Sequence, residues 1–271
     1  MSNIIIGTAV NYFIEDISPF LNSLHNNFNG ELFLLTNQEK TKKNKKRYSF
    51  NIRYFDYEES EKENPVKFNS VNNSRLFWYL KIVEQLAEKD NVLLTDVRDV
   101  FFQSDPFVNL NRDLILVARE DQYLRNCPYN SDWILSLYGE EYYNKIRDNF
   151  IYCSGTILGA KKEIQKTLEF MVSELISRGV NLDTGDNIKI LDQGIFNYYV
   201  YENPNRCIIN DNQNGTIYTM GYSDKFVCKT NGRISNFNNI DYAIVHQYDR
   251  FKWLTEHVYK NFKETNKRWF I

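Results

Sequence analysis

Two carboxylates, Asp96 and Asp99, stand where one apolar run ends and another begins, within residues 92–102. Carboxylates at the end of a strand can hold a hard divalent ion, and that ion can neutralise a diphosphate. The same side chains could instead cap a helix or bond to the backbone of a turn, so this segment alone leaves both interpretations open. The reaction that would use such an ion is transfer of a group activated by a diphosphate.

A histidine and a lysine further along the chain could complete this site. His246 ends an apolar run at residues 242–246, which is typical of a short strand, and Lys252 lies six residues later. An imidazole nitrogen is a ligand for transition metals such as manganese, and an ammonium group can stabilise negative charge on a departing diphosphate. A lone histidine usually has a structural role, so this hypothesis depends on the residues around it.

The elements that would position these residues alternate between strand and helix. Helical spacing predicts helices over residues 17–28, from Ser74 as a candidate N-cap through Leu86, and over residues 164–177. Short apolar runs predict buried strands at residues 4–10, 31–36, 52–55 and 91–94. This alternation predicts an α/β protein with a mostly parallel sheet flanked by helices, whose site lies at the carboxyl ends of the strands.

Composition limits the class of protein. At 271 residues and 42% hydrophobic content the chain can bury a substantial core, and no internal repeat or Pro/Gly-rich linker divides it, so we expect a single compact domain. With 33 basic and 35 acidic side chains, the net charge of −2 gives no indication of nucleic-acid binding. The four cysteines lack a zinc-binding spacing, and neither an N-terminal leader nor a long apolar run is seen, so we expect a cytoplasmic protein.

Several segments together resemble glycosyltransferase family 8, a group of retaining galactosyl- and glucosyltransferases with the Rossmann-like GT-A fold. The resemblance is carried by residues 8–12, 75–76, 96–99, 153–159, 191–197 and 245–253. The first of these segments would place Thr8, Ala9, Asn11 and Tyr12 at the nucleotide, although the acid that the family has before Asn-Tyr is missing. Asp249 also replaces a glycine of the family's late motif.

The resemblance also implies a metal site. The family's D-x-D motif corresponds to Asp96-Val97-Arg98, so that Arg98 stands in place of the second aspartate and Asp99 follows one position later. Either the turn is reshaped so that Asp96 and Asp99 both bind the metal, or the positive charge of Arg98 partly replaces the metal. The implied ligands are Asp96, Asp99 and His246, and the implied ion is Mn²⁺ or Mg²⁺.

Other matching positions imply contacts with the donor. Arg75 would approach the sugar and diphosphate, Lys252 the diphosphate, and Ser154 with Gly155 the donor sugar. Asp192 and Gln193 would face the transferred sugar near its reacting carbon and form the catalytic pair. An aspartate before an apolar run is also a common N-cap, which is the alternative for Asp192.

The implied reaction is metal-dependent transfer of a hexose from a nucleotide diphosphate sugar, UDP-linked as in the family, to a glycan or lipid-linked glycan acceptor, in surface polysaccharide biosynthesis. Residues 1–110 would form the nucleotide-sugar-binding half, and residues 111–271 the acceptor and catalytic half. Retention of configuration is implied; one alternative is an inverting GT-A transferase with Asp192 as the general base. The other is a non-catalytic nucleotide-sugar-binding protein, which the altered metal motif favours.

The end of the chain interleaves cations with aromatic side chains. Lysine and arginine occur at positions 260, 263, 267 and 268, and aromatic residues at positions 259, 262, 269 and 270. This combination suits peripheral contact with an anionic membrane surface, where a lipid-linked acceptor would lie. A tail that packs on the domain is the alternative.

Overall fold

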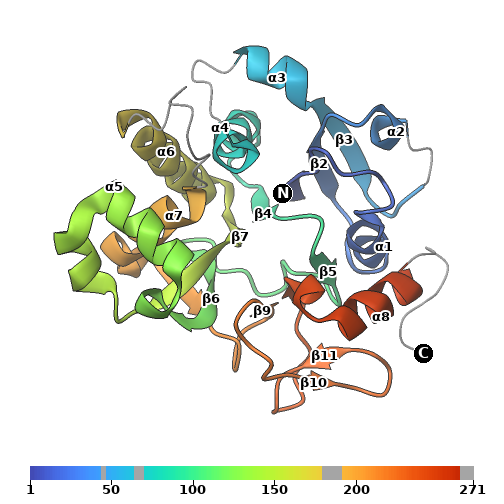
Figure 1. Cartoon of the computed structure of the whole chain (residues 1–271). Coiled ribbons are helices and arrows are strands. Elements are labelled where there is room, and N and C mark those ends of the chain that lie inside the picture. The colour runs from blue at the N-terminus through green and yellow to red at the C-terminus, as the bar shows by residue number, and fades with distance from the viewer. Residues whose placement is uncertain (44–46, 64–69, 179–190, 263–271) are drawn as a thin grey trace.

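The computed structural model describes residues 1–43, 47–63, 70–178 and 191–262. Its main sheet has seven strands in the order β3-β2-β1-β4-β7-β6-β8 (Figure 1). All neighbouring strands are parallel except at β7, which runs antiparallel to both β4 and β6. The strands are β1 (Asn3–Thr8), β2 (Glu31–Thr36), β3 (Asn51–Asp56), β4 (Asn91–Thr95), β6 (Ile115–Tyr123), β7 (Phe150–Ala160) and β8 (Cys207–Asn210).

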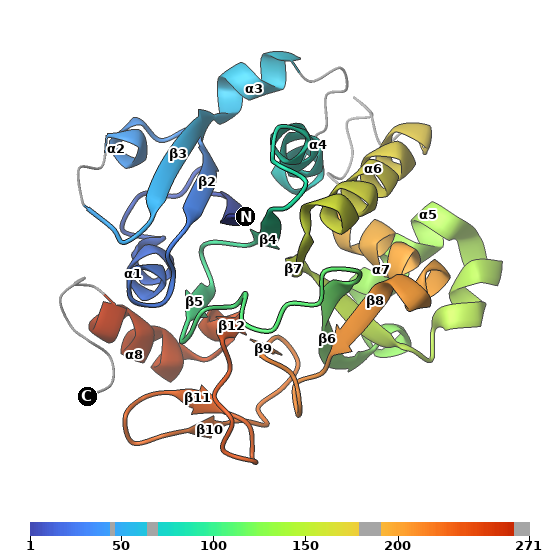
Figure 2. The same ribbon diagram turned by 180° about the vertical axis from the view of Figure 1, so that it is seen from behind.

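Helices cover both faces of this sheet (Figures 1 and 2). Ile4 and Ile6 of β1 pack with α4, α6 and α7 on one face, whereas Ile5 packs with α1 on the other. This alternation follows from the period of two in a strand, and because both faces are buried the strands read as continuous apolar runs. The α-helices are α1 (Ser18–Asn27), α2 (Glu39–Lys42), α3 (Tyr57–Glu63), α4 (Val71–Glu84), α5 (Pro128–Ile146), α6 (Lys161–Ser177), α7 (Asp192–Glu202) and α8 (Lys252–Phe262).

A second, small sheet lies beside the main one and contributes to the site. It has the order β5-β12-β9, with β5 antiparallel and β9 parallel to β12. Its strands are β5 (Val100–Phe102), β9 (Ile217–Thr219) and β12 (Ile244–His246), and a two-stranded sheet joins β10 (Val227–Cys228) to β11 (Ile234–Ser235). Single 3₁₀ turns occur at η1 (Leu124–Asn126), η2 (Pro204–Arg206) and η3 (Tyr248–Arg250).

The structure confirms the α/β class and the mostly parallel sheet flanked by helices. Strands from both halves of the chain join in the one main sheet. One predicted helix start was wrong: the N-cap of α4 is Ser70, whose hydroxyl accepts from the Asn72 N–H, while Ser74 is buried inside the helix and donates back to the Ser70 carbonyl. Sequence spacing favoured Ser74 because the apolar positions become regular only from there.

The predicted strand at residues 242–246 forms as β12, but it belongs to the small sheet and not to the main one. No helix within the described residues is long and apolar enough to cross a membrane. Most of the C-terminal segment predicted to meet a membrane, residues 263–271, lies outside the described part of the chain.

Candidate functional site

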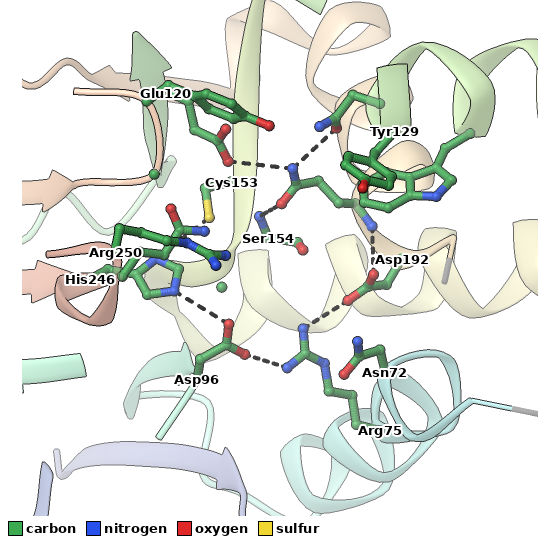
Figure 3. Close-up of a pocket in the computed structure, with 17 residues that line it drawn as sticks. Asn72, Arg75, Asp96, Glu120, Tyr129, Cys153, Ser154, Asp192, His246 and Arg250 are labelled. Carbon is green, nitrogen blue, oxygen red and sulfur yellow. Dashed lines mark hydrogen bonds and ion pairs between the residues drawn. The ribbon is translucent and has the colours of Figure 1, made fainter. Parts of the chain in front are cut away.

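Two adjoining cavities open where β1 and β4 end. The larger, of about 510 Å³, lies between β7, α5, α7 and the segment after β12 (Figure 3). The smaller, of about 380 Å³, lies between the segments that follow β1 and β4. Asn72, Arg75 and Asp96 line both cavities and therefore mark their junction. This position agrees with the prediction that ligands bind at the carboxyl ends of the strands.

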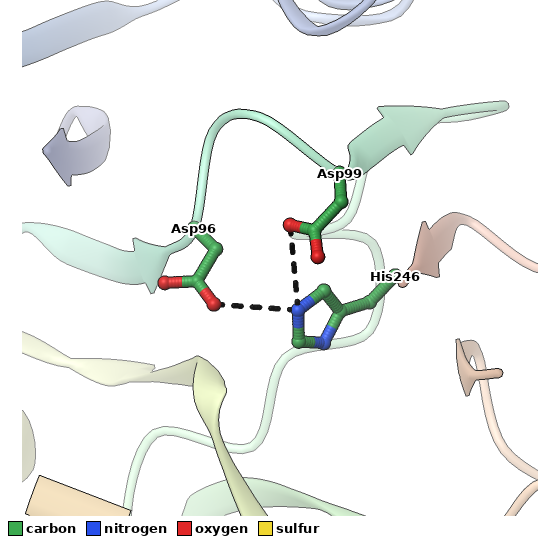
Figure 4. Close-up of side chains that lie close together, drawn as sticks. All are labelled: Asp96, Asp99 and His246. Carbon is green, nitrogen blue, oxygen red and sulfur yellow. Dashed lines mark ion pairs between the residues drawn. The ribbon is translucent and has the colours of Figure 1, made fainter. Parts of the chain in front are cut away.

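At this junction Asp96, Asp99 and His246 come together (Figure 4). His246 Nε2 lies 3.4 Å from Asp96 Oδ2 and 3.8 Å from Asp99 Oδ1. The register of the small sheet produces this meeting, because β5 begins directly after Asp99 and its Val100 pairs with His246 of β12. The Gln247 N–H also donates to the Asp99 carbonyl at 2.8 Å, which fixes the turn against the end of β12.

Three observations indicate that the cluster could hold a divalent ion. His246 is 1% exposed, yet its Nε2 has no hydrogen-bond partner among the described residues, so a buried nitrogen is left for a ligand. One ligand atom from each of the three residues lies within 4.8 Å of the others. The adjacent Gly155 leaves the space open, since a Cβ there would lie 2.6 Å from Asp96 Oδ2 and 2.9 Å from His246 Nε2. Carboxylate oxygens and an imidazole nitrogen are ligands that a divalent cation can accept.

The electrostatics of the cluster favour added positive charge. Burial raises the pKa of Asp96, but the charges of Arg75 and His246 outweigh it and hold that pKa well below its usual range. Burial also raises the pKa of Asp99, and here it prevails over the opposing effect of His246. Burial would lower the pKa of His246, but Cys153 and the carboxylates raise it well above its ordinary value. The two carboxylates therefore give the space beside His246 a negative potential, which would attract a metal cation in competition with a proton.

Arg75 connects the metal cluster to the predicted catalytic pair. It lies on α4, is largely buried, and pairs with Asp96 through Nη1 and with Asp192 Oδ2 through Nη2 at 2.7 Å. Its Nε is buried and has no partner within the described residues. A buried guanidinium between two carboxylates fixes the positions of both, and it places a cation at the junction of the cavities.

Asp192 and Gln193 occupy the first turn of α7 and face the larger cavity. Asp192 Oδ1 accepts from the Gln193 N–H at 2.9 Å, while Oδ2 is directed at Arg75. The N-cap alternative for Asp192 was wrong, because the N-cap of α7 is Leu191 and no side-chain hydrogen bond caps this helix. Gln193 Oε1 accepts from the Ser154 N–H at 3.3 Å, and Gln193 Nε2 donates to Asn130 Oδ1 at 3.1 Å.

Glu120 is a site residue that the sequence analysis missed. It lies on β6, is 2% exposed, lines the larger cavity and accepts from Gln193 Nε2 at 3.4 Å. Burial raises its pKa from 4.5 to about 7, against the opposing effects of His246 and a hydrogen bond from Cys153. The sequence offered no clear signal for Glu120, because it stands in the polar second half of β6 between Arg119 and Asp121.

The smaller cavity holds most of the residues predicted for the nucleotide. Thr8, Asn11, Tyr12 and Arg98 line it together with Asp99. Asn11 has a φ of 63°, in the left-handed region that asparagine tolerates, and its side chain accepts from Asn37 Nδ2 at 2.9 Å. The strand thus turns sharply at its carboxyl end and directs the segment after β1 over the cavity.

Ala9 and Lys252 are not brought to either cavity. Ala9 is fully buried beneath the smaller one, where its carbonyl accepts from the Thr36 hydroxyl at 3.1 Å. Lys252 is exposed at the start of α8. Besides Arg75, the larger cavity is lined by the cation Arg250, which forms no side-chain hydrogen bond or ion pair within the described residues. Arg250 ends the η3 turn and Lys252 begins α8, and of these two only Arg250 reaches the cavity.

Comparison with known proteins identifies no family, since no protein-family model matches the chain and no curated protein matches its sequence. The function must therefore be inferred from the geometry and chemistry of the site.

Proposed function

We propose that this protein is a metal-dependent glycosyltransferase of the GT-A fold that transfers a hexose from a nucleotide diphosphate sugar, UDP-linked, to a glycan or lipid-linked glycan acceptor. The observation that carries the proposal is the cluster of Asp96, Asp99 and His246 at the junction of two cavities, with Arg75 joining it to Asp192. The sheet order and the position of the cavities at its carboxyl edge support the GT-A assignment, as does the resemblance to family 8.

The two cavities suggest how the donor would bind. The nucleoside would occupy the smaller cavity beside Asn11 and Tyr12, the diphosphate the metal cluster, and the sugar the larger cavity beside Asp192. A bound Mn²⁺ would neutralise charge that develops on the diphosphate. Arg75, already held at the junction, would add a fixed guanidinium, and Arg250 could reach the same charge from the larger cavity.

Transfer would form a bond between the acceptor hydroxyl oxygen and the anomeric carbon while the bond from that carbon to the diphosphate oxygen breaks. The nucleoside diphosphate leaves with the electron pair, and the hydroxyl proton passes to its departing oxygen. Asp192, kept in place by Arg75, and Gln193, kept by Asn130 and Ser154, would hold the sugar hydroxyls and leave one face of the carbon open. Retention is what the resemblance to family 8 implies, and in the inverting alternative Asp192 would take the proton instead.

A screen of nucleotide sugars for manganese-dependent release of free nucleotide tests the proposal. We expect release from at least one donor, loss of release in a chelator, and a large loss in Asp96→Asn. The matched control is Asp113→Asn, the same chemical change at an exposed aspartate away from both cavities. Binding of a nucleotide sugar without release or transfer would favour the non-catalytic binding protein, and no metal-dependent binding at all would refute the proposal. The anomeric configuration of the product separates retention from inversion.

A further inference from the structure

Three aromatic side chains stand at the opening of the larger cavity. Tyr129 and Trp133 come from α5, and Tyr222 comes from the turn after β9. Tyr129 is 71% exposed, Tyr222 is 44% exposed and Trp133 is half-buried. The deep part of the same cavity is different in character, since Asp192 and Glu120 there are almost fully buried. Figure 3 shows the Tyr129 ring across from Glu120 and on the side of Asp192.

The positions of these rings are fixed by the fold. Tyr129 and Trp133 are four residues apart on one helix, so they project from the same face. The helix packs directly on the helix that carries the catalytic pair, because a Cβ at Gly194 of α7 would lie only 3.0 Å from Trp133 Cβ. The Tyr222 hydroxyl lies 3.1 Å from Cys127 Sγ, directly before α5, and this contact joins the third ring to the helix.

Among the described residues, no other aromatic ring or cation lies on the faces of these three rings, although Trp133 also packs in part against the core. Many aromatic residues of the chain pack on one another, as Tyr138 and Tyr198 do with stacked rings 4.0 Å apart. In the described part of the chain, no ring pair or cation contact over a ring involves Tyr129, Trp133 or Tyr222. Exposed aromatic faces at the opening of a polar cavity are typical of a binding surface.

We propose that Tyr129, Trp133 and Tyr222 form the acceptor subsite and that they stack on the apolar face of a pyranose ring. A pyranose presents a flat face of C–H groups and a rim of hydroxyls, so it needs aromatic surface together with polar groups at the side. Polar side chains line the same cavity, and among them Asn130 can supply such a group. The acceptor is therefore a carbohydrate whose terminal sugar enters the site, rather than a polypeptide or a simple alcohol.

This inference rests on the proposed function, because an acceptor subsite requires a donor. Binding of a sugar to the three rings can nevertheless be tested without a donor. Saturation-transfer NMR would measure binding of the methyl glycosides of glucose, galactose, mannose and N-acetylglucosamine to the full chain. We expect at least one to bind. Tyr129→Ala and Trp133→Ala should each weaken that binding about three- to tenfold, and Trp133→Phe should restore most of it.

The matched control is Trp253→Ala, which removes an exposed tryptophan on α8 that stacks on Phe226 and lines neither cavity. It should bind the glycoside like the wild type. Tyr129 is mostly exposed, so Tyr129→Ala keeps the test valid even if Trp133→Ala disturbs folding. With a donor present, the subsite variants should raise the acceptor KM and leave the donor KM unchanged.

Three results would overturn the inference: no glycoside of the panel binds, the Tyr129 and Trp133 variants bind as the wild type does, or uridine displaces the glycoside from Trp133. The last result would make the rings a nucleobase platform. The two proposals fail separately. Nucleotide release without glycoside binding refutes only the subsite, whereas glycoside binding without any nucleotide-sugar binding refutes only the proposed function.

Discussion

Replacing Glu120 by glutamine should change how the stability of the protein depends on pH. The carboxyl group is 2% exposed, and burial raises its pKa from 4.5 to about 7 in the folded protein. Between pH 4.5 and 7 the folded state therefore keeps a proton that the unfolded state has released. Stability must fall as pH rises through this range, because folding requires either proton uptake or burial of a charge.

The size of the effect follows from the pKa difference. At about 1.4 kcal/mol for each pKa unit, the wild type should lose about 3 kcal/mol of unfolding free energy between pH 4.5 and pH 8 through this residue. Glu120→Gln keeps the shape and the acceptor oxygen for Gln193 but has no proton to lose, so its stability should lack this decline. The variant should accordingly be the more stable protein at pH 8 and close to the wild type at pH 4.5.

Urea unfolding of the metal-free protein at several pH values measures this difference. The two curves of free energy against pH should separate steadily above pH 4.5 and run parallel above pH 7. Glu141→Gln, the same chemical change at an exposed position of α5, is the control and should follow the wild type throughout. Curves that stay parallel from pH 4.5 to 8 would show that Glu120 ionises normally and would refute the reasoning.

Three further predictions concern the proposed reaction. Asp99→Asn should weaken Mn²⁺ binding, measured by calorimetry, and abolish metal-stimulated turnover while the circular dichroism spectrum stays unchanged; full turnover would remove Asp99 from the site. Arg250→Ala should lower turnover, measured as the initial rate, by about two to three orders of magnitude, whereas Lys252→Ala should leave it nearly unchanged. A larger loss in Lys252→Ala than in Arg250→Ala would show that Lys252 stabilises the diphosphate. Deletion of residues 266–271, which lie outside the described structure, should weaken binding to anionic vesicles by about 1 kcal/mol for each cation removed, in a salt-dependent way, without loss of activity on a soluble acceptor; equal vesicle binding would exclude the membrane role.

The sequence determined the elements because their signals are local. Continuous apolar runs predicted β1, β2 and β4, and helical spacing predicted α1 and α6, since burial on one or both faces requires a fixed period along the chain. It also indicated which residues could bind a metal, because the position of Asp96 and Asp99 after a strand is a local feature. The start of α4 was misplaced, since Ser70 and Ser74 offer the same capping chemistry.

The assembly of the site was decided by tertiary structure. The register of β12 against β5 brings His246 to Asp99, and no pattern in either segment specifies that pairing. Arg75 meets Asp192 across 117 residues because α4 and α7 pack on the same face of the sheet. Glu120 owes its raised pKa to burial in the cavity wall, and such burial depends on what packs around a residue and not on its neighbours in the chain.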